Sequence, residues 1–290
     1  MRSTPISRPL FATSNLATSL LALALLPLFS ACSTSVSSER DSSVVAETPH
    51  DDANAVMADL DETSGNVLFV LTNHTQLGDT ETPTGYYLSE VTHPWAVLTD
   101  AGFTVDFASP RGGPVTADPK SLDLDDPVNQ RFWENDDLRR KLNTTIPAAE
   151  VAADRYDAIY FAGGHGTMWD FADDDVIQQL TARVWEAGGA VAAVCHGPAA
   201  LLNVRLSNGD WLVSDRRVTG FTDAEERAVE LEEIVPFLLE TELRERGAIF
   251  DGADDFQENV IADGRLVTGQ NPASATGVGQ ALVRVLTLDE

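Results

Sequence analysis

The sequence contains little cysteine and few basic side chains. Its 290 residues include two cysteines, Cys32 and Cys195, which lie in very different contexts. This excludes a disulfide framework as the basis of the fold. There are 19 basic residues against 46 acidic ones, and the formal net charge is -27. A surface this acidic argues against binding to nucleic acid and against attachment to anionic lipid by charge.

The N-terminal part lacks an apolar run long enough to span a bilayer comfortably. Residues 20–30 are apolar and follow a start with two arginines, which is the pattern of a secretory signal peptide. The run ends in Leu-Phe-Ser-Ala-Cys, which resembles the bacterial lipobox. We therefore expect residues 1–31 to be removed and Cys32 to be lipidated, which places the protein in the cell envelope. The alternative is ordinary cleavage near Ala31, which would leave a soluble secreted or periplasmic protein.

Residues 32–64 lack a persistent apolar period. They consist mainly of serine, aspartate, alanine and glutamate with scattered valines, a composition that predicts a flexible tether. The tether would join the lipid on Cys32 to a folded domain at residues 65–290. That lipid is the only membrane contact that we expect.

Strand-like apolar runs alternate with helical patterns through the folded domain, and short glycine-rich turns join them. This alternation predicts an α/β fold, a three-layer α/β/α sandwich with a mostly parallel sheet, whose functional site lies at the carboxyl ends of the strands. The predicted strands are 66–72, 103–109, 158–162, 189–194 and 260–268, with another near 248 and a hairpin of 211–214 with 217–219. The predicted helices are 86–100, 176–187, 232–246 and 274–286.

One stretch, residues 188–202, combines a strand, a reactive side chain and a helix. It reads GGAVAAVCHGPAALL. The apolar run predicts a strand buried on both faces, and the segment after Pro198 predicts a helix. Cys195 lies at the turn between them, as in a nucleophile elbow. A helix N-terminus lowers the pKa of a thiol, so we expect a nucleophilic thiolate; the alternative is a buried structural cysteine.

A long segment at about residues 111–147 interrupts the alternation. It carries several prolines, an acidic patch at residues 123–126 and the aromatic side chains Phe132 and Trp133. A long insertion between core elements is often a lid over a site. An acidic surface loop is the equally weighted alternative.

Five motifs in order resemble those of the PfpI-like superfamily, which has the class I glutamine amidotransferase-like fold. They are TGYYLSEVTHPW, FAGGHG, VCHGP, VTGFTDAEE and TGQNPASA. The branch that they resemble most is that of the thirty-one-kilodalton heat-shock chaperones, which act as glutathione-independent glyoxalases. The resemblance covers about residues 66–286. It implies a flavodoxin-like sandwich, commonly homodimeric, with a cap insertion over the active site.

The same resemblance implies a Cys-His-Glu triad, and the matching positions are Cys195, His196 and Glu90. A carboxylate beside a thiol can accept or donate its proton, which suits this assignment. Without the motif, Glu90 would be interpreted as a solvated helix residue. A Gly-Gly turn leaves the backbone open to a substrate oxygen, so we expect the N–H groups of Gly164 and His196 to form an oxyanion hole.

The histidines exclude one activity and leave a question open. None follows His196, whereas a glutaminase would need a histidine late in the domain as the base for its cysteine. His93 and His165 either line the pocket, order a loop or hold a metal with Glu90. Their spacing is not distinctive for a metal site, so we expect no metal and no other cofactor.

Three functions compete at this stage. The first is a lyase of the glyoxalase III or D-lactate dehydratase type, which converts a small dicarbonyl, methylglyoxal, and water to lactate through a hemithioacetal on Cys195. The second is a cysteine hydrolase, peptidase or protein deglycase that uses the same thiol. The third is a holding chaperone, which needs exposed apolar patches rather than a triad.

Overall fold

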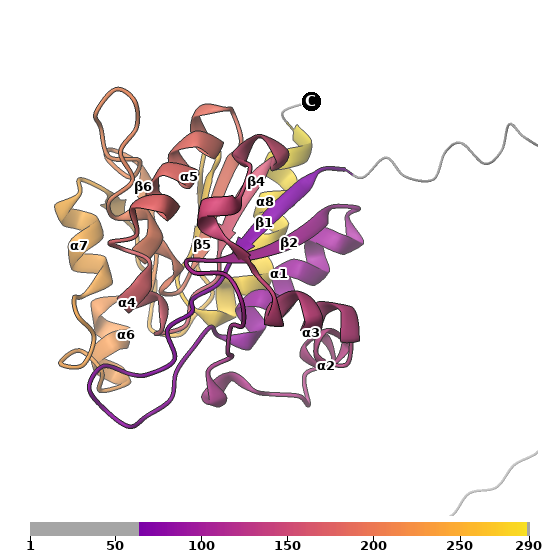
Figure 1. The fold of residues 1–290 in the computed structure, drawn as a ribbon. Helices are drawn as coiled ribbons and strands as arrows, with labels where there is room; N and C mark the ends of the chain where they lie inside the picture. Colours follow the sequence, from indigo (N-terminus) through magenta and orange to yellow (C-terminus); the bar gives the residue numbers. More distant parts are fainter. Residues whose placement is uncertain (1–63, 289–290) are drawn as a thin grey trace, which may run out of the picture. The chain divides into compact units, whose positions relative to one another are not determined.

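The computed structural model describes residues 64–288; the expected signal peptide, Cys32 and nearly all of the expected tether lie outside them. The central sheet of this part has the strand order β3-β2-β1-β4-β5-β9-β8 (Figure 1). All its pairings are parallel except that of β8 with β9. The strands are β1 (Asn66–Val70), β2 (Thr104–Ser109), β3 (Ile146–Pro147), β4 (Ala158–Phe161), β5 (Ala190–Val194), β8 (Val260–Asp263) and β9 (Leu266–Gly269). This is the predicted α/β fold.

Helices cover both faces of the sheet. On one face α1 packs against α8, and on the other lie α5 and α7 (Figure 1). Side chains of β1 alternate between the two apolar cores, with Val67 and Phe69 in one and Leu68 and Val70 in the other. The helices are α1 (Leu88–Asp100), α2 (Pro127–Trp133), α3 (Asp136–Asn143), α4 (Thr167–Asp170), α5 (Asp175–Glu186), α6 (Asp223–Ala228), α7 (Leu239–Glu245) and α8 (Ala275–Leu288).

The central strands form where the sequence is apolar without interruption. All residues of β4 and β5 are buried, and so are all but the first of β1. A parallel strand with helices on both sides has no face toward water, which explains the absence of polar alternation. The predictions of β1, β4 and β5 rest on this property and are confirmed; the predicted strands 103–109 and near 248 are confirmed as well, although they are only partly buried.

Two strand predictions are wrong. The hairpin of 211–214 with 217–219 does not form: residues 212–215 make consecutive turns, and the N–H of Leu212 donates to Val204 O instead. Instead β6 (Arg217–Val218) pairs in parallel with β7 (Ile249–Phe250). The predicted strand 260–268 is two antiparallel strands, since Gly264 turns the chain at a φ angle of 59°; Asp-Gly is a common sequence at hairpin turns.

The helix predictions differ at two places. The predicted helix 232–246 shrinks to α7, because Pro236 cannot continue a helix through its own position. The segment after the elbow is a short 3-10 helix, η4 (Gly197–Leu201), rather than an α-helix. The predicted helix 86–100 is confirmed as α1, which includes Pro94.

The insertion contacts the edge of the sheet with one part and the cavity with another. Its helices α2 and α3 lie beside α1 and the edge of the sheet (Figure 1). Phe132 of α2 packs edge-on against Trp95 and Phe107, with ring centroids 5.1 and 6.1 Å apart. Asp118 and Lys120, near its beginning, line the cavity described below. This first part reaches the cavity, whereas α2 and α3 pack beside α1 and the sheet edge; a lid over the site stays a prediction.

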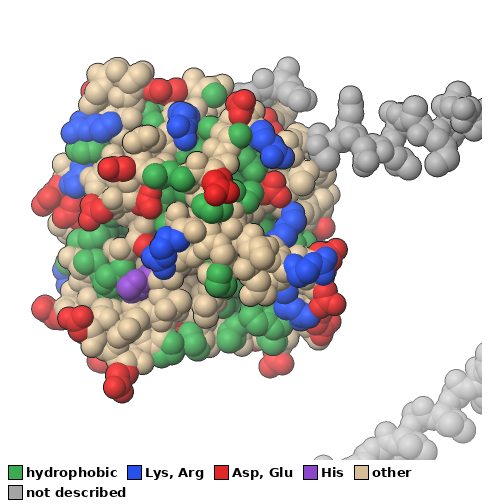
Figure 2. All heavy atoms as spheres, in the orientation of Figure 1, with side chains coloured by type: hydrophobic (Ala, Val, Ile, Leu, Met, Phe, Trp, Pro, Cys, Tyr) green, Lys and Arg blue, Asp and Glu red, His purple; other side chains and the backbone are tan. Residues whose placement is uncertain are grey.

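Acidic side chains are scattered over the visible face and alternate with basic and apolar ones (Figure 2). In the part of the chain that the structure describes, no helix is both long and apolar enough to cross a membrane.

Candidate active site

The predicted elbow is present at the carboxyl end of β5. Cys195 has a φ angle of 59°, a left-handed conformation that strains a non-glycine residue. Its N–H donates to Gly269 O at 2.9 Å, and its carbonyl accepts from Phe221 N at 2.8 Å. The residue is 3% exposed and lines a cavity of about 250 Å³. The turn therefore presents the thiol to a small, partly open cavity.

The loop after β4 approaches the elbow so closely that it requires glycine. A Cβ atom on Gly163 would lie 2.5 Å from Val194 O and 2.7 Å from His196 N. Gly164 has a φ angle of 98°, which side chains disfavour. This loop brings the Gly164 N–H to the sulfur of Cys195, to which it donates a hydrogen bond.

The two predicted oxyanion-hole donors adjoin the thiol. The Gly164 N–H points at the sulfur, and the other donor is the N–H of His196, the next residue after Cys195. Neither N–H donates to a backbone carbonyl within residues 64–288. Two N–H groups beside a nucleophile, neither of them used by a backbone carbonyl, can hold the negative charge that develops on a substrate oxygen.

Glu90 lies in the first turn of α1 with its side chain fully buried. Its Oε2 accepts a hydrogen bond from Gly163 N at 2.8 Å, whereas Oε1 has no partner of standard geometry among the described residues. Burial raises the pKa of Glu90 to about 8, against the weaker opposing effects of hydrogen bonds with Cys195 and Gly163. The carboxyl group therefore keeps its proton at pH 7 and can act as an acid.

The thiol of Cys195 is not activated in the way that the sequence suggested. Burial raises its pKa well above the ordinary value, and Glu90 and Glu225 raise it further, while the Gly164 N–H acts in the opposite direction. The predicted lowering by a helix N-terminus is wrong, because η4 is a short 3-10 helix and removal from water outweighs it. A base must therefore take the thiol proton during the reaction.

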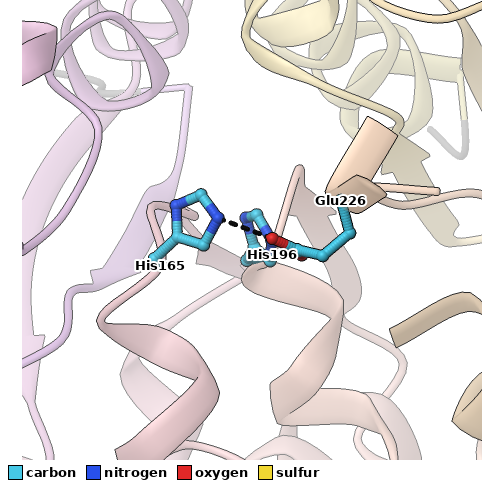
Figure 3. Close-up of side chains that lie close together, drawn as sticks. All are labelled: His165, His196 and Glu226. Carbon is cyan, nitrogen blue, oxygen red and sulfur yellow. Dashed lines mark hydrogen bonds and ion pairs between the residues drawn. The ribbon is translucent and has the colours of Figure 1, made fainter. Parts of the chain in front are cut away.

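His196 is placed to be that base. Its Nδ1 lies 3.3 Å from the sulfur of Cys195, and its Nε2 lies 2.8 Å from Oε2 of Glu226 (Figure 3). Burial is the largest effect on Glu226 and would raise its pKa, but the charges and hydrogen bonds of His196 and His165 together lower that pKa to about 2. The ionised carboxylate accepts the Nε2 proton, so Nδ1 is left as an acceptor toward the thiol. Burial also lowers the pKa of His196, which keeps the ring neutral at pH 7.

The carboxylate bonded to His196 is Glu226, which the sequence analysis did not single out. It lies in α6, where the N-cap Thr222 and Glu225 form a capping box. The residues Thr-Asp-Ala-Glu within the motif VTGFTDAEE are a typical helix start, and this was the available signal. Glu90 lies on the sulfur side of the site and Glu226 on the imidazole side. The triad role of Glu90 stays a prediction.

The structure places His93 and His165, whose roles the sequence left open, in different surroundings. His165 lines the cavity, its Nε2 lies 2.9 Å from Oε1 of Glu226, and its ring centroid is 4.1 Å from that of His196. His93 instead bonds Asp126, the N-cap of α2, at 3.2 Å. Of the three alternatives, His165 lines the pocket and His93 orders the insertion.

The structure brings together three possible metal ligands that differ from the set His93, His165 and Glu90 suggested by the sequence. The ligand atoms of His165, His196 and Glu226 lie within 4.8 Å of one another (Figure 3). Both oxygens of Glu226 already accept hydrogen bonds from the imidazoles, at 2.9 and 2.8 Å. These bonds account for the arrangement without an ion.

The cavity is mostly apolar away from the reactive groups. Lys120 from the insertion and the phenol-bearing Tyr87 of the loop before α1 reach its wall. Phe256 stands at the wall with a φ angle of 60°, its N–H bound to Glu225 at 2.7 Å. The apolar lining residues are Leu77, Pro83, Phe221, Val229, Leu231, Phe256 and Pro272. A small uncharged molecule fits such a space better than a peptide.

The chain is similar to curated proteins and to solved structures over most of its length. A probable glutathione-independent glyoxalase, hsp3103, of Schizosaccharomyces pombe is 35% identical over 237 residues, which cover 70% of this chain and 90% of that protein. The Rapid Encystment Protein 24 KDa of Francisella tularensis is 40% identical with a TM-score of 0.74, over 77% of this chain and 99% of that one. Glyoxalase III of Candida albicans is 26% identical with a TM-score of 0.72, over 77% and 98% of the two chains.

A family model matches the part of the chain that carries this site. It spans residues 82–285, from the segment before α1 into α8, and its description is the DJ-1/PfpI family. Cys195, His196, Glu90 and Glu226 all lie within the match. The chain is a member of the DJ-1/PfpI family, in the branch of the glutathione-independent glyoxalases.

Proposed function

We propose that this protein is a glutathione-independent glyoxalase that converts methylglyoxal and water to lactate, a lyase of the glyoxalase III type. The observation that carries the proposal is a buried thiol, Cys195, that meets a base on one side and a protonated carboxyl on the other at the wall of a small cavity. The names of its relatives from Schizosaccharomyces pombe and Candida albicans support the same activity.

The first step is addition of the thiol to the aldehyde. Nδ1 of His196 accepts the thiol proton as the sulfur bonds to the aldehyde carbon, because a thiolate is nucleophilic and a thiol is not. The aldehyde oxygen gains negative charge and accepts hydrogen bonds from the N–H groups of Gly164 and His196. The imidazolium then returns its proton to this oxygen, which completes the hemithioacetal. Glu226 stabilises the imidazolium in the interval.

The second step moves hydrogen between the two substrate carbons. A proton leaves the former aldehyde carbon and another reaches the neighbouring carbonyl carbon through an enediol, which yields a lactoyl thioester on Cys195. Glu90 is buried beside the sulfur, has a protonated carboxyl at pH 7 and has one oxygen without a standard hydrogen bond. It is the group we assign to these transfers: its carboxyl gives its proton to the ketone oxygen, and the resulting carboxylate takes the proton from the former aldehyde carbon, which forms the enediol. The carboxyl then protonates the neighbouring carbon and takes back the hydroxyl proton of the first carbon, so that Glu90 ends protonated.

Water then cleaves the thioester and releases lactate. The aldehyde carbon is oxidised and the ketone carbon is reduced within one molecule, so the stoichiometry requires neither glutathione nor an external redox partner.

A product assay tests the proposal. Purified protein is mixed with methylglyoxal in the absence of glutathione, and lactate is measured by NMR. We expect lactate from the wild type and from Cys32→Ala, and none from Cys195→Ala. Peptide cleavage, or release of amine from a glycated peptide, without lactate would favour the hydrolase or deglycase alternative. Suppression of aggregation that survives in Cys195→Ala would indicate a separate chaperone activity.

We also propose that the enzyme is held in the cell envelope by a lipid on Cys32. The lipobox-like sequence before this residue supports the proposal. Mass spectrometry of the mature N-terminus should find a diacylglycerol thioether on Cys32, and an unmodified N-terminus would contradict it.

The family resemblance further supports a homodimer. Light scattering of the mature domain measures its mass directly, and the mass of a single chain would contradict this proposal.

A further inference from the structure

Glu226 binds two imidazoles, and the proposed addition step uses one of them. Its Oε2 bonds Nε2 of His196 at 2.8 Å, and its Oε1 bonds Nε2 of His165 at 2.9 Å (Figure 3). We propose that His165 is the base that activates the water which cleaves the lactoyl thioester on Cys195. This inference rests on the proposed glyoxalase function and assigns a residue to its last step.

The two rings differ in their access to water. The side chain of His196 is 0% exposed, whereas that of His165 is 19% exposed and lines the cavity. In the enzyme without substrate both nitrogens of His196 are engaged, one with the sulfur and one with Glu226. Nε2 of His165 bonds Glu226, and its Nδ1 has no hydrogen bond to another described residue. His165 therefore combines an acceptor that no described residue uses with a ring that lines the cavity.

The ring of His165 is also held in place. Its centroid lies 4.1 Å from that of His196 with the rings tilted by 42°, and 6.0 Å from that of Phe221. The hydrogen bond to ionised Glu226 puts the proton on Nε2 and leaves the lone pair on Nδ1. Glu226 thus sets the same tautomer in both rings.

The step balances as follows. The water oxygen bonds to the acyl carbon, and one water proton passes to Nδ1 of His165. The carbon–sulfur bond then breaks with its electron pair on the sulfur. Lactic acid carries the second water proton away. The proton on His165 returns to the sulfur of Cys195 through water that refills the cavity, which restores the thiol.

The experiment separates formation of the thioester from its cleavage. His165→Gln and His165→Asn are each mixed with methylglyoxal, quenched at short times and analysed by intact-protein mass spectrometry. The matched control is His93→Gln, which removes an imidazole that bonds a carboxylate outside the cavity. Circular dichroism establishes that each variant is folded.

We expect both variants to form one lactoyl group on Cys195 at nearly the wild-type rate and then stall. Hydroxylamine, which cleaves thioesters, should remove the adduct. Steady-state turnover should fall by about a hundredfold or more, as it does when a general base is lost, and His93→Gln should behave as wild type. The Gln and Asn side chains differ in length, so one variant can fold where the other does not. Either variant that folds tests the proposal.

Three results would overturn it. A folded His165 variant that loses turnover without an adduct would place the residue before the thioester, and one with full turnover would exclude any role. Loss of wild-type turnover on treatment with a chelator, with recovery in zinc, would replace the base by a metal-bound water on the same three side chains. Failure of the wild type to make lactate would instead refute the proposed function itself.

Discussion

Nε2 of His196 lies 2.8 Å from a carboxylate oxygen of Glu226, thirty residues further along the chain. This hydrogen bond holds the neutral imidazole of His196 with its acceptor, Nδ1, toward the sulfur of Cys195. The arrangement has the roles of a nucleophile, a base and a carboxylate that orients the base. The carboxylate comes from α6, a helix remote from the elbow in sequence.

Removal of the charge on Glu226 should therefore slow the reaction at its first step. In Glu226→Gln the amide can present its N–H to His196, and the tautomer with a free Nδ1 is no longer favoured. We expect kcat/KM for methylglyoxal to fall by about a hundredfold or more. Asp223→Asn removes one charge from the same helix at a half-buried position that bonds Thr241, and it should stay near wild type. Equal activity of the two variants would exclude Glu226 from the reaction.

The rate should depend on pH through two groups. His196 must be neutral to accept the thiol proton, and burial lowers its pKa from 6.5, so activity should decline only below about pH 6.5. Glu90 must be protonated, and its pKa of about 8 predicts a second decline above that pH. A profile of kcat/KM against pH checks both limbs. In Glu90→Gln the limb near pH 8 should disappear from the residual activity; its persistence would assign that limb to another group, such as the thiol.

Glu90 should also make stability depend on pH. The folded chain holds its proton up to about pH 8, whereas the unfolded chain releases it near 4.5. Between these values the unfolded state binds fewer protons, so the free energy of unfolding decreases as pH rises. The wild type should lose roughly 1.4 kcal/mol per pH unit in this window relative to Glu90→Gln, whose amide does not ionise. Urea unfolding of both proteins at pH 5, 6, 7 and 8 measures the difference. Parallel curves would mean that Glu90 ionises normally.

Two glycines allow strain and steric exclusion to be separated. Gly164 and Gly188 both have a φ angle of 98°, but a Cβ on Gly164 would lie 2.3 Å from Gly85 O, whereas one on Gly188 would meet nothing within 4 Å. Gly188→Ala should cost about 1–2 kcal/mol of stability from strain alone. Gly164→Ala should cost several kcal/mol and displace the proposed oxyanion hole. Thermal unfolding and kcat measure these effects, and equal losses in both variants would mean that the loop can move aside.

The parts of the fold that could be predicted from sequence are those set by local pattern. The runs NVLFV, AIYF and AVAAV have no polar residue to place at a surface after their first position, so a buried parallel sheet follows. Strands were predicted at the positions of β6 and β7, but their pairing with each other was not, because two-residue strands carry almost no pattern and packing decides their partner. The start of α7 after Pro236, rather than at residue 232, also follows from the sequence, because a proline inside a helix removes a backbone hydrogen bond.

At the site, the sequence pointed to Cys195, His196, Glu90 and the Gly-Gly loop because each belongs to a motif. The structure brings all of them together. The sequence could not show which glutamate faces the imidazole, since that depends on where α6 docks. The direction of the thiol pKa was wrong for a related reason: burial is a property of the folded chain, and here it exceeds the effect of a short helix.

The left-handed backbone at Cys195 has a consequence for the evolution of the chain. A residue with a Cβ at a φ angle of 59° gives up roughly 1 kcal/mol relative to glycine. Cys195→Gly should consequently unfold at a higher temperature than Cys195→Ala, although both lack the thiol. A copy of the chain released from selection for chemistry would drift toward glycine at this position. A cysteine retained at this position, where the backbone favours glycine, therefore indicates selection for its chemistry. This inference needs only one sequence.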